Sequence, residues 1–268
     1  MNVQTTGPVL LHEREDDVAI LALNRPVARN SLSEALLTAL TQALRDIAGD
    51  ASVRAVVIAA AGPAFCAGHD LKELTAHRTE SDRGRAYFHK IMTMCSAMMQ
   101  QIVALPQPVI AAVQGPASAA GCQLVASCDL AIASEAAKFA TPGVDIGLFC
   151  STPMVALSRN VARKHAMEML LTGEMVSADH AARIGLINRV VAPGRERDEA
   201  IALAKKIGSK SSYTVKIGKE GFYRQAEMPL AQAYEYVSQV MVENLLARDA
   251  EEGICAFIDK RPPRWEDR

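Results

Sequence analysis

Short apolar runs alternate with stretches of helical periodicity in the first half of the chain. Val18–Leu23 has the composition of a β-strand, and Ala55–Ala60 is a nearly continuous apolar run, as in strands buried on both faces. Between them, Ser33 can cap a helix that has an apolar face and ends at Gly49. This alternation predicts a mixed α/β core.

The alternation continues through a long helix and further short strands. Residues 85–105 have helical periodicity, and Pro106 and Pro108 end that helix. Four of its methionines, at positions 92, 94, 98 and 99, suit either a ligand pocket or the core, and we favour core filling. Further strands are predicted at residues 109–114, 130–134, 138–140 and 186–191.

The pattern becomes helical beyond residues 195–198. Consecutive amphipathic helices are expected over residues 199–208, 212–223, 230–247 and 250–260. Helices in such a tail have little core of their own, so they suit docking onto a partner subunit. We therefore divide the chain into an α/β core at 1–195 and a helical oligomerisation region at 196–268.

The composition of the chain excludes several classes of function. The chain has 268 residues, of which 50% are hydrophobic, and its formal net charge is -1. A sizeable core is therefore possible, whereas a global field for nucleic acid or an anionic membrane is absent. The apolar runs are too short to span a bilayer.

The start of the chain and the spacing of the cysteines indicate in which cellular compartment the protein is expected. The first eleven residues have neither the pattern of a signal peptide nor that of an Arg- and Ser-rich leader, so we expect a cytoplasmic protein. None of the six cysteines forms a Cys-x-x-Cys pair, and none has zinc-site spacing with histidine. Reduced thiols and no metal site are the expectation.

Two loops of small residues are the candidates for chemistry. Residues 65–72 and 114–123 each follow a buried strand and open a helix. Backbone N–H groups at such a position favour negative charge, and two such loops side by side would form an oxyanion hole. The spacing of either loop alone also fits an ordinary strand-to-helix turn.

The segments around these loops resemble a known family nearly from end to end. They are residues 24–26, 30–32, 65–72, 108–115, 121–124, 128–130, 166–173, 181–186, 252–253 and 256–261. Together they resemble the crotonase superfamily, the enoyl-CoA hydratases and isomerases. Residues 141–143 and 147–152 look more narrowly like the enoyl-CoA hydratase domain-containing protein 3 group.

The resemblance implies a spiral of ββα units with a C-terminal helical trimerisation region. It also implies a lyase of fatty acid metabolism that forms trimers or dimers of trimers. The ligand would be an acyl-CoA thioester, with coenzyme A as part of the substrate and no other cofactor. By motif position, the oxyanion donors are the backbone N–H groups of His69 and Ala120. The family's substrate and CoA contacts map onto Arg25, Ala28, Ala67, His69, Asp70, Leu71, Lys72, Ala120, Phe257 and Lys260.

The chain departs from the family pattern at both acid/base positions. The two glutamates that hydratases use align with Gln123 and Gly143. An amide cannot take up a proton near neutral pH, and glycine has no side chain. Since each such group contributes roughly 10²–10⁴-fold in rate, we do not expect efficient enoyl-CoA hydration.

Other proton carriers and two functions remain open. His69 and Asp145 are the first candidates, while Cys150 and Ser151 lack a basic partner that would activate them. One hypothesis is another enolate-stabilising reaction on an acyl-CoA, such as decarboxylation, thioester hydrolysis or isomerisation. The other is a non-catalytic acyl-CoA-binding regulator.

Overall fold

A six-stranded sheet forms the centre of the molecule, for which a computed structural model describes residues 7–268. Its first two strands are antiparallel, and the others join in parallel. In spatial order the strands are β1 (Leu10–Glu15), β2 (Val18–Leu23), β3 (Ala55–Ala60), β4 (Val109–Val113), β6 (Leu130–Ser134) and β9 (Arg189–Val191). Residues 1–6, part of the segment searched for a leader and of the predicted core, lie outside the described residues.

Helices cover both faces of this sheet. The helices of the body are α1 (Glu34–Ala48), α2 (Leu71–Ala76), α3 (Arg85–Ala104), α4 (Ala120–Ser127), α5 (Pro153–Asn160), α6 (Arg163–Thr172), α7 (Ala178–Arg183) and α8 (Glu196–Gly208). Three short 3₁₀ helices are η1 (Pro26–Ala28), η2 (His77–Thr79) and η3 (Pro142–Ile146).

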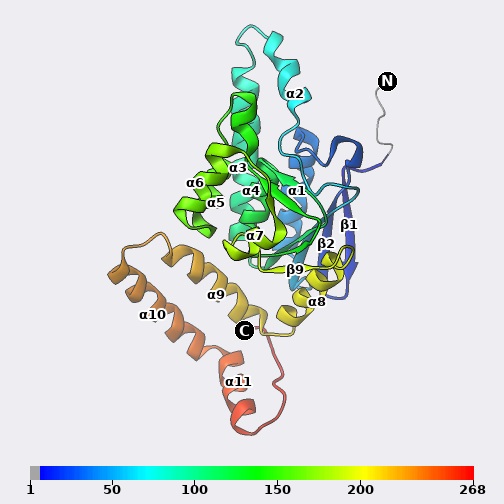
Figure 1. Cartoon of the computed structure of the whole chain (residues 1–268). Coiled ribbons are helices and arrows are strands. Elements are labelled where there is room, and N and C mark those ends of the chain that lie inside the picture. The colour runs from blue at the N-terminus through cyan, green and yellow to red at the C-terminus, as the bar shows by residue number, and fades with distance from the viewer. Residues whose placement is uncertain (1–6) are drawn as a thin grey trace.

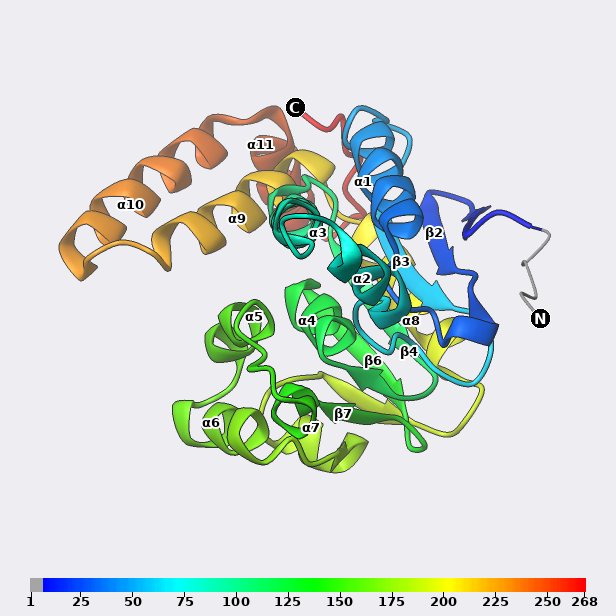
Figure 2. The same cartoon turned by 90° about the horizontal axis from the view of Figure 1, so that it is seen from above.

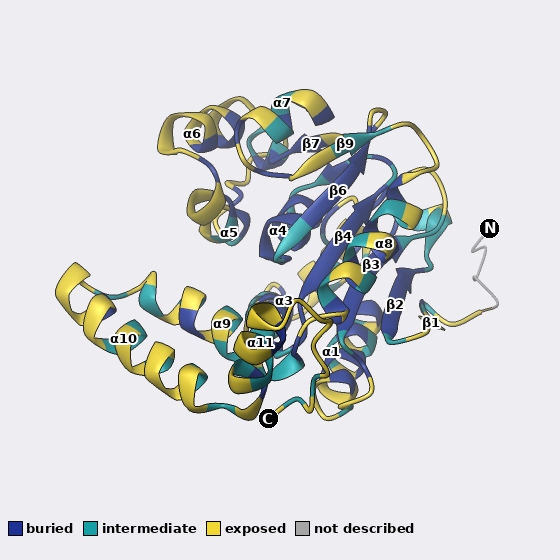
Figure 3. Cartoon of the chain, turned by 90° about the horizontal axis from the view of Figure 1, so that it is seen from below, coloured by how far each residue is buried: buried dark blue, intermediate teal, exposed yellow. Residues whose placement is uncertain are grey.

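The alternation of side chains along β2 shows how the two faces are covered. Val18 and Ile20 pack with Ala200 of α8, whereas Ala19 and Leu21 belong to the larger core that α1 and α3 complete. Figures 2 and 3 show α1 and α3 on one side of the sheet and α8 on the other. The methionines of α3 fill this core or pack against it, as expected.

The parallel register places the two candidate loops next to each other. β2 pairs with β3, and β3 pairs with β4, so their carboxyl ends meet at one edge of the sheet. A small second sheet of β5 (Ala117–Ser118), β7 (Lys138–Ala140) and β8 (Val176–Ser177) lies beside that edge. The loop after β4 therefore continues directly into β5, whose backbone is hydrogen-bonded within this second sheet.

The last three helices extend away from the body (Figure 1). They are α9 (Ser212–Gln225), α10 (Leu230–Leu246) and α11 (Arg248–Ile258). Much of α10 and α11 is exposed (Figure 3), including apolar side chains such as Leu246, 76% exposed, and Phe257, 85% exposed. The predicted boundary at residue 195 assigns α8 to the helical region, although α8 packs on the sheet and the extension begins at α9.

Buried polar contacts hold α9 to the body. Lys219 Nζ lies 2.7 Å from Asp129 Oδ2 and 3.1 Å from the carbonyl oxygens of Ile102 and Gln107. Tyr223 donates its hydroxyl hydrogen to Asp129 Oδ1 at 2.9 Å.

Among residues 7–268 no helix has the length and apolar composition needed to cross a membrane.

Candidate active site

Backbone hydrogen bonds join the two candidate loops. The N–H groups of Phe65 and Cys66 both donate to the carbonyl of Pro116, at 3.0 and 3.2 Å. Ser118 returns a hydrogen bond to the carbonyl of Cys66 at 2.9 Å. The two loops predicted from sequence therefore form one rigid unit at the carboxyl edge of the sheet.

Glycines make this close approach possible. A Cβ atom at Gly121 would overlap the carbonyl of Cys66, and one at Gly115 would overlap the carbonyl of Pro63. Gly68 has a φ of 95°, and a Cβ there would lie 3.0 Å from the Cβ of Ala119. The close approach of the two loops therefore explains on steric grounds why glycine occupies both ends of the Gly-x₅-Gly sequence after β4.

The N–H groups of His69 and Ala120 are free within this unit. Leu32 pairs with the strand-like backbone at His69 by donating to Gly68 and accepting from Asp70, which leaves the N–H of His69 on the opposite side. Ala120 opens α4, where the first N–H groups have no intrahelical acceptor. Neither N–H donates to another residue in the described part of the chain.

Ala119 fixes the direction of the second donor. Its φ of 51° and ψ of -117° are unusual for a residue with a side chain. The hydrogen bond from its N–H to the carbonyl of Ala140, 2.9 Å long, holds it in place. Such strain is stored where the surrounding structure over-determines a conformation, as it does at many active sites.

Two of the predicted CoA contacts bind each other. Arg25 Nη2 lies 2.9 Å from Asp70 Oδ2, and its Nη1 donates to the carbonyl of Ser31 at 2.6 Å. Asp70 also caps α2 by accepting from the N–H groups of Lys72 and Glu73. Burial opposes ionisation of Asp70, but the hydrogen bond from Arg25 holds its pKa below the usual range. This pair positions the His69 loop.

The other predicted contacts divide into two groups. The N–H of Ala67 donates to Arg29, directly after Ala28 in η1, and Leu71 and Lys72 are exposed at the start of α2. The structure thus brings residues 25, 28, 67, 69–72 and 120 together. Phe257 and Lys260, however, lie at or just beyond the end of α11, at the opposite end of the molecule from α2 (Figure 1).

The positions assigned to the missing glutamates are both buried. Gln123 is 4% exposed, and its Oε1 has no hydrogen-bond partner in the described structure. A Cβ atom at Gly143 would lie 3.0 Å from Cys150 Sγ and 3.0 Å from the carbonyl oxygen of Leu148. The Cys150 thiol, whose pKa is raised by burial, therefore fills the space beside Gly143.

Burial disfavours the charged form of the His69 side chain. Both ring nitrogens are buried without a partner among the described residues, and burial lowers the pKa of the imidazole. In its neutral form the ring can donate one hydrogen bond and accept another.

The remaining proton-transfer candidates have exposed side chains. The Asp145 carboxylate is exposed on η3, where its Oδ2 would lie 3.1 Å from a Cβ at Gly173. Ser151 is exposed and hydrogen-bonds only to the carbonyl of Phe149 within the described chain.

Thr141 is a polar residue at this site that the sequence argument missed. It is 0% exposed, and its Oγ1 has no partner in the part of the chain that is described. Thr141 directly follows Ala140, which binds Ala119. The only signal in the sequence was a hydroxyl residue after a short predicted strand, which by itself does not indicate a site.

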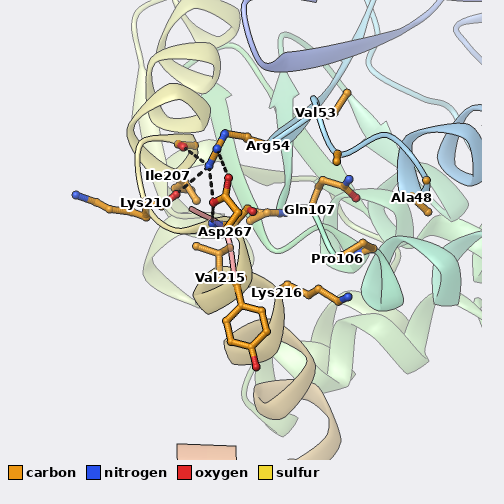
Figure 4. A pocket seen from close by; sticks show the side chains of 16 residues that line it. Ala48, Val53, Arg54, Pro106, Gln107, Ile207, Lys210, Val215, Lys216 and Asp267 are labelled. Atoms are coloured by element: carbon orange, nitrogen blue, oxygen red, sulfur yellow. Dashed lines mark hydrogen bonds and ion pairs between the residues drawn. The ribbon is translucent and has the colours of Figure 1, made fainter. Parts of the chain in front are cut away.

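A cavity of about 310 Å³ lies elsewhere, between the body and the helical extension. Residues at the end of α1, before β3 and β4, and around the start of α9 line it, as Figure 4 shows. Arg54 binds Asp267 across this cavity. None of the predicted site residues lines it, so the cavity is separate from the paired donors.

Comparisons with known proteins identify the family of this chain. Residues 13–268 match the model of the enoyl-CoA hydratase/isomerase family. The chain belongs to the enoyl-CoA hydratase/isomerase family. Rat enoyl-CoA hydratase domain-containing protein 3 is 48% identical, over 94% of this chain and 82% of its own length. A putative enoyl-CoA hydratase of Thermus thermophilus is 37% identical, over 92% of this chain and 97% of its own.

Solved structures of the family confirm the predicted crotonase fold. An enoyl-CoA hydratase from Mycobacterium smegmatis matches with a TM-score of 0.92 and 53% identity, over 97% of this chain and 99% of that one. Human enoyl-CoA hydratase domain-containing protein 3 matches with a TM-score of 0.90 and 45% identity, over 96% and 100%. The narrower resemblance to the domain-containing protein 3 group is confirmed as well.

The comparisons contradict one expectation. The rat and human relatives are named as mitochondrial proteins, so the predicted cytoplasmic location is wrong. That prediction rested on the lack of a recognisable leader pattern alone, which is a weak guide to the compartment.

Proposed function

We propose that this member of the enoyl-CoA hydratase/isomerase family binds an acyl-CoA thioester and holds its carbonyl oxygen between the N–H groups of His69 and Ala120. The observation that carries the proposal is this pair of free donors on a rigid double loop. Preorganised donors stabilise an oxygen that gains negative charge without having to reorganise. The names of the relatives, as enoyl-CoA hydratases, support the same ligand class.

The proposal also predicts that this site catalyses enoyl-CoA hydration poorly. Position 123 has an amide, position 143 has no side chain, and Cys150 occupies the adjoining space. Asp145, the nearest carboxylate in sequence to position 143, is exposed on η3. The functions left to the paired donors are an enolate-stabilising step, as in decarboxylation, thioester hydrolysis or isomerisation, and binding without turnover. Coenzyme A enters only as part of the substrate.

Assembly completes the proposed CoA site. Phe257 and Lys260 lie at or just beyond the end of α11, whereas the His69 loop leads into α2 at the opposite end of the molecule (Figure 1), so we assign their CoA contact to the site of a neighbouring copy. The exposed apolar side chains of α10 and α11 supply a surface for such a neighbour. We therefore propose a trimer or a dimer of trimers, with the helical region as its interface.

Calorimetry with acetoacetyl-CoA tests the binding proposal. We expect micromolar affinity, about -8 kcal/mol. Ala120→Pro removes one donor and should weaken binding about tenfold, since one hydrogen bond contributes roughly 0.5–1.5 kcal/mol. Ala120→Gly keeps the N–H and is the matched control.

The folding of both variants is checked by circular dichroism, because proline restricts the residue before it. If the wild type binds none of a series of acyl-CoA thioesters, the proposed function is wrong. Equal affinities of the proline variant and the wild type would show that the N–H of Ala120 is not a donor to the ligand.

A further inference from the structure

The cavity of about 310 Å³ lies where the helical extension meets the body, and both contribute to its walls (Figure 4). Apolar side chains line it from the body at Ala48, Val53, Pro106 and Ile207, and from the extension at Val215 of α9. Cavities of about 300–1,000 Å³ are typical of small-molecule sites. A small ligand in this cavity would therefore contact the body and the extension together.

The ion pair at this cavity is satisfied by its own partners. Arg54 Nη1 lies 3.1 Å from Asp267 Oδ1, and Arg54 Nη2 binds Asp267 Oδ2. Asp267 Oδ1 also accepts a hydrogen bond from the N–H of Ser212 at 2.9 Å. The guanidinium of Arg54 donates in addition to the carbonyl of Lys210 at 3.2 Å. Neither charge of this pair is therefore left for a ligand.

A hydrogen-bond acceptor remains unused on Gln107, which lines the cavity next to Pro106. Gln107 is 8% exposed, and its Nε2 donates to the carbonyl of Ile47 at 2.9 Å. This hydrogen bond fixes the orientation of the amide, while its Oε1 has no partner among residues 7–268. Buried polar atoms of folded proteins nearly always have a hydrogen-bond partner, and an amide oxygen can only accept. The missing partner is therefore a donor.

Lys216 brings an unpaired positive charge to the same cavity. It lies on α9, and Figure 4 shows its side chain reaching toward the wall that Pro106 forms. Of the two lysines of α9, both within the described residues, Lys219 forms an ion pair and Lys216 forms none. Lys210 also lines the cavity without an acidic partner in the described chain, so the uncompensated charge around the cavity is positive.

We propose that this cavity binds a short hydroxycarboxylate. The carboxylate pairs with the ammonium group of Lys216, the hydroxyl donates to Gln107 Oε1, and the carbon chain lies against Val53 and Val215. A fatty acid anion without the hydroxyl leaves Gln107 Oε1 unpaired. An amino acid brings a further ammonium group into a site whose uncompensated charge is already positive. The cavity is separate from the paired donors, so this inference does not depend on the proposed function.

The test compares four-carbon acids that differ in one group. Saturation-transfer NMR titrations of the whole chain are run with butyrate, both enantiomers of 3-hydroxybutyrate, and 3-aminobutyrate. We expect one 3-hydroxybutyrate enantiomer to bind about fivefold more tightly than butyrate, because it forms one more hydrogen bond. The amino acid should bind more weakly than butyrate. Saturating acetoacetyl-CoA should displace none of them, because the paired donors lie elsewhere.

Trp265, the only tryptophan of the chain, reports whether the ligand is in this cavity. Its Nε1 donates to the carbonyl of Ser209 at 3.0 Å, between the cavity residues Gly208 and Lys210. Asp267, which lines the cavity, follows two positions later. The fluorescence of Trp265 should therefore change on binding, with the affinity that the NMR titration gives.

Three variants assign the binding to its residues. Lys216→Met should weaken the binding of butyrate and 3-hydroxybutyrate alike, by about threefold, because it removes the partner of the carboxylate. Gln107→Met should remove the preference for 3-hydroxybutyrate over butyrate. Lys206→Met changes an exposed lysine of α8 outside the cavity and should alter neither. Thermal melting curves check folding, and if Gln107→Met is unfolded, the ligand series and Lys216→Met decide.

Each contrary result overturns the site. Equal affinities of butyrate and both 3-hydroxybutyrate enantiomers would indicate that water is the partner of Gln107 Oε1. Displacement by acetoacetyl-CoA, or binding without a change in Trp265 fluorescence, would place the ligand outside this cavity. Binding of none of the four acids would refute the site directly. All of these results leave the binding of acyl-CoA thioesters at the paired donors unaffected.

Discussion

Cys150 determines what can be built at position 143. Its sulfur lies 3.0 Å from the point where a side chain at Gly143 would begin, and the carbonyl of Leu148 lies equally near. Replacing the glycine alone would force the backbone or the thiol to move, which typically costs 1–3 kcal/mol in a packed site. Restoring a carboxylate at this position therefore requires a change at Cys150 as well.

The rate of crotonyl-CoA hydration tests whether Cys150 limits the effect of a carboxylate restored at position 143. The wild type should hydrate crotonyl-CoA several orders of magnitude more slowly than a member with two glutamates, because each acid/base group is worth roughly 10²–10⁴-fold. Gln123→Glu with Gly143→Glu should raise the rate little. Adding Cys150→Gly to that pair should raise it further, because the thiol no longer fills the space.

The measurement is the loss of the enone absorbance. Cys150→Gly alone is the control and should leave the rate at the wild-type level. Rapid hydration by the wild type would show that the proton-transfer argument is wrong and that another group, such as His69, carries the proton.

At the residue scale, the sequence predicted the two adjacent loops better than the side chains around them. The two loops could be found because small residues and glycines mark a close approach of backbone segments. The pairing of Arg25 with Asp70, the thiol of Cys150 beside Gly143, and the orphaned Thr141 depend on contacts between segments far apart in the chain. Local pattern carries no information about such contacts.

Among the elements, α9 depends on one buried ion pair. Burial lowers the pKa of Lys219, and its ammonium group is held by Asp129 and two carbonyl oxygens. Lys219→Met would leave Asp129 buried without its counter-charge. Breaking a buried pair in this way typically costs about 3–5 kcal/mol.

Urea denaturation checks this expectation. Lys219→Met should lower the free energy of unfolding by about that amount, or produce a separate early transition as α9 detaches. Lys216→Met changes an exposed lysine of the same helix and should have little effect. If the two variants have the same midpoint, the ion pair does not anchor α9.

The sequence predicted the buried strands well and the strands at the edges of the sheet poorly. The strands β2, β3, β4, β6 and β7 lie where the apolar runs placed them, to within a residue. β1 was missed because most of its side chains are exposed and its sequence is polar. The run at 186–191 was expected to be one strand, but Leu186 and Ile187 both bind the carbonyl of Ala181 in a turn, and only Arg189–Val191 is extended.

At the scale of the whole molecule, the exposed apolar side chains of the helical extension call for a partner. They include Leu230, Tyr234, Met241, Leu245, Leu246, Ile254, Phe257 and Ile258. A large set of exposed apolar side chains on one part of the molecule is typical of an interface. The proposed partner is a second copy of the chain.

Light scattering after gel filtration measures this assembly. At micromolar concentration the mass should be three or six times 28.8 kDa. Leu246→Asp puts a charge on the exposed face and should shift the population toward monomers. Asn244→Asp adds the same charge where the side chain contacts Thr214 of its own chain, and should leave the mass unchanged. A monomeric wild type would contradict the assembly.

The paired donors are groups of the peptide backbone, and this affects how the protein tolerates mutation. Apart from proline, no substitution at position 69 or 120 deletes an N–H group. The close approach of the loops that carry these N–H groups instead depends on the absence of a side chain at Gly68, Gly115 and Gly121, where any Cβ would push the loops apart. The proposed site therefore depends on three positions that contribute no side chain to it. The side chains that decide its chemistry can diverge while those three glycines stay fixed.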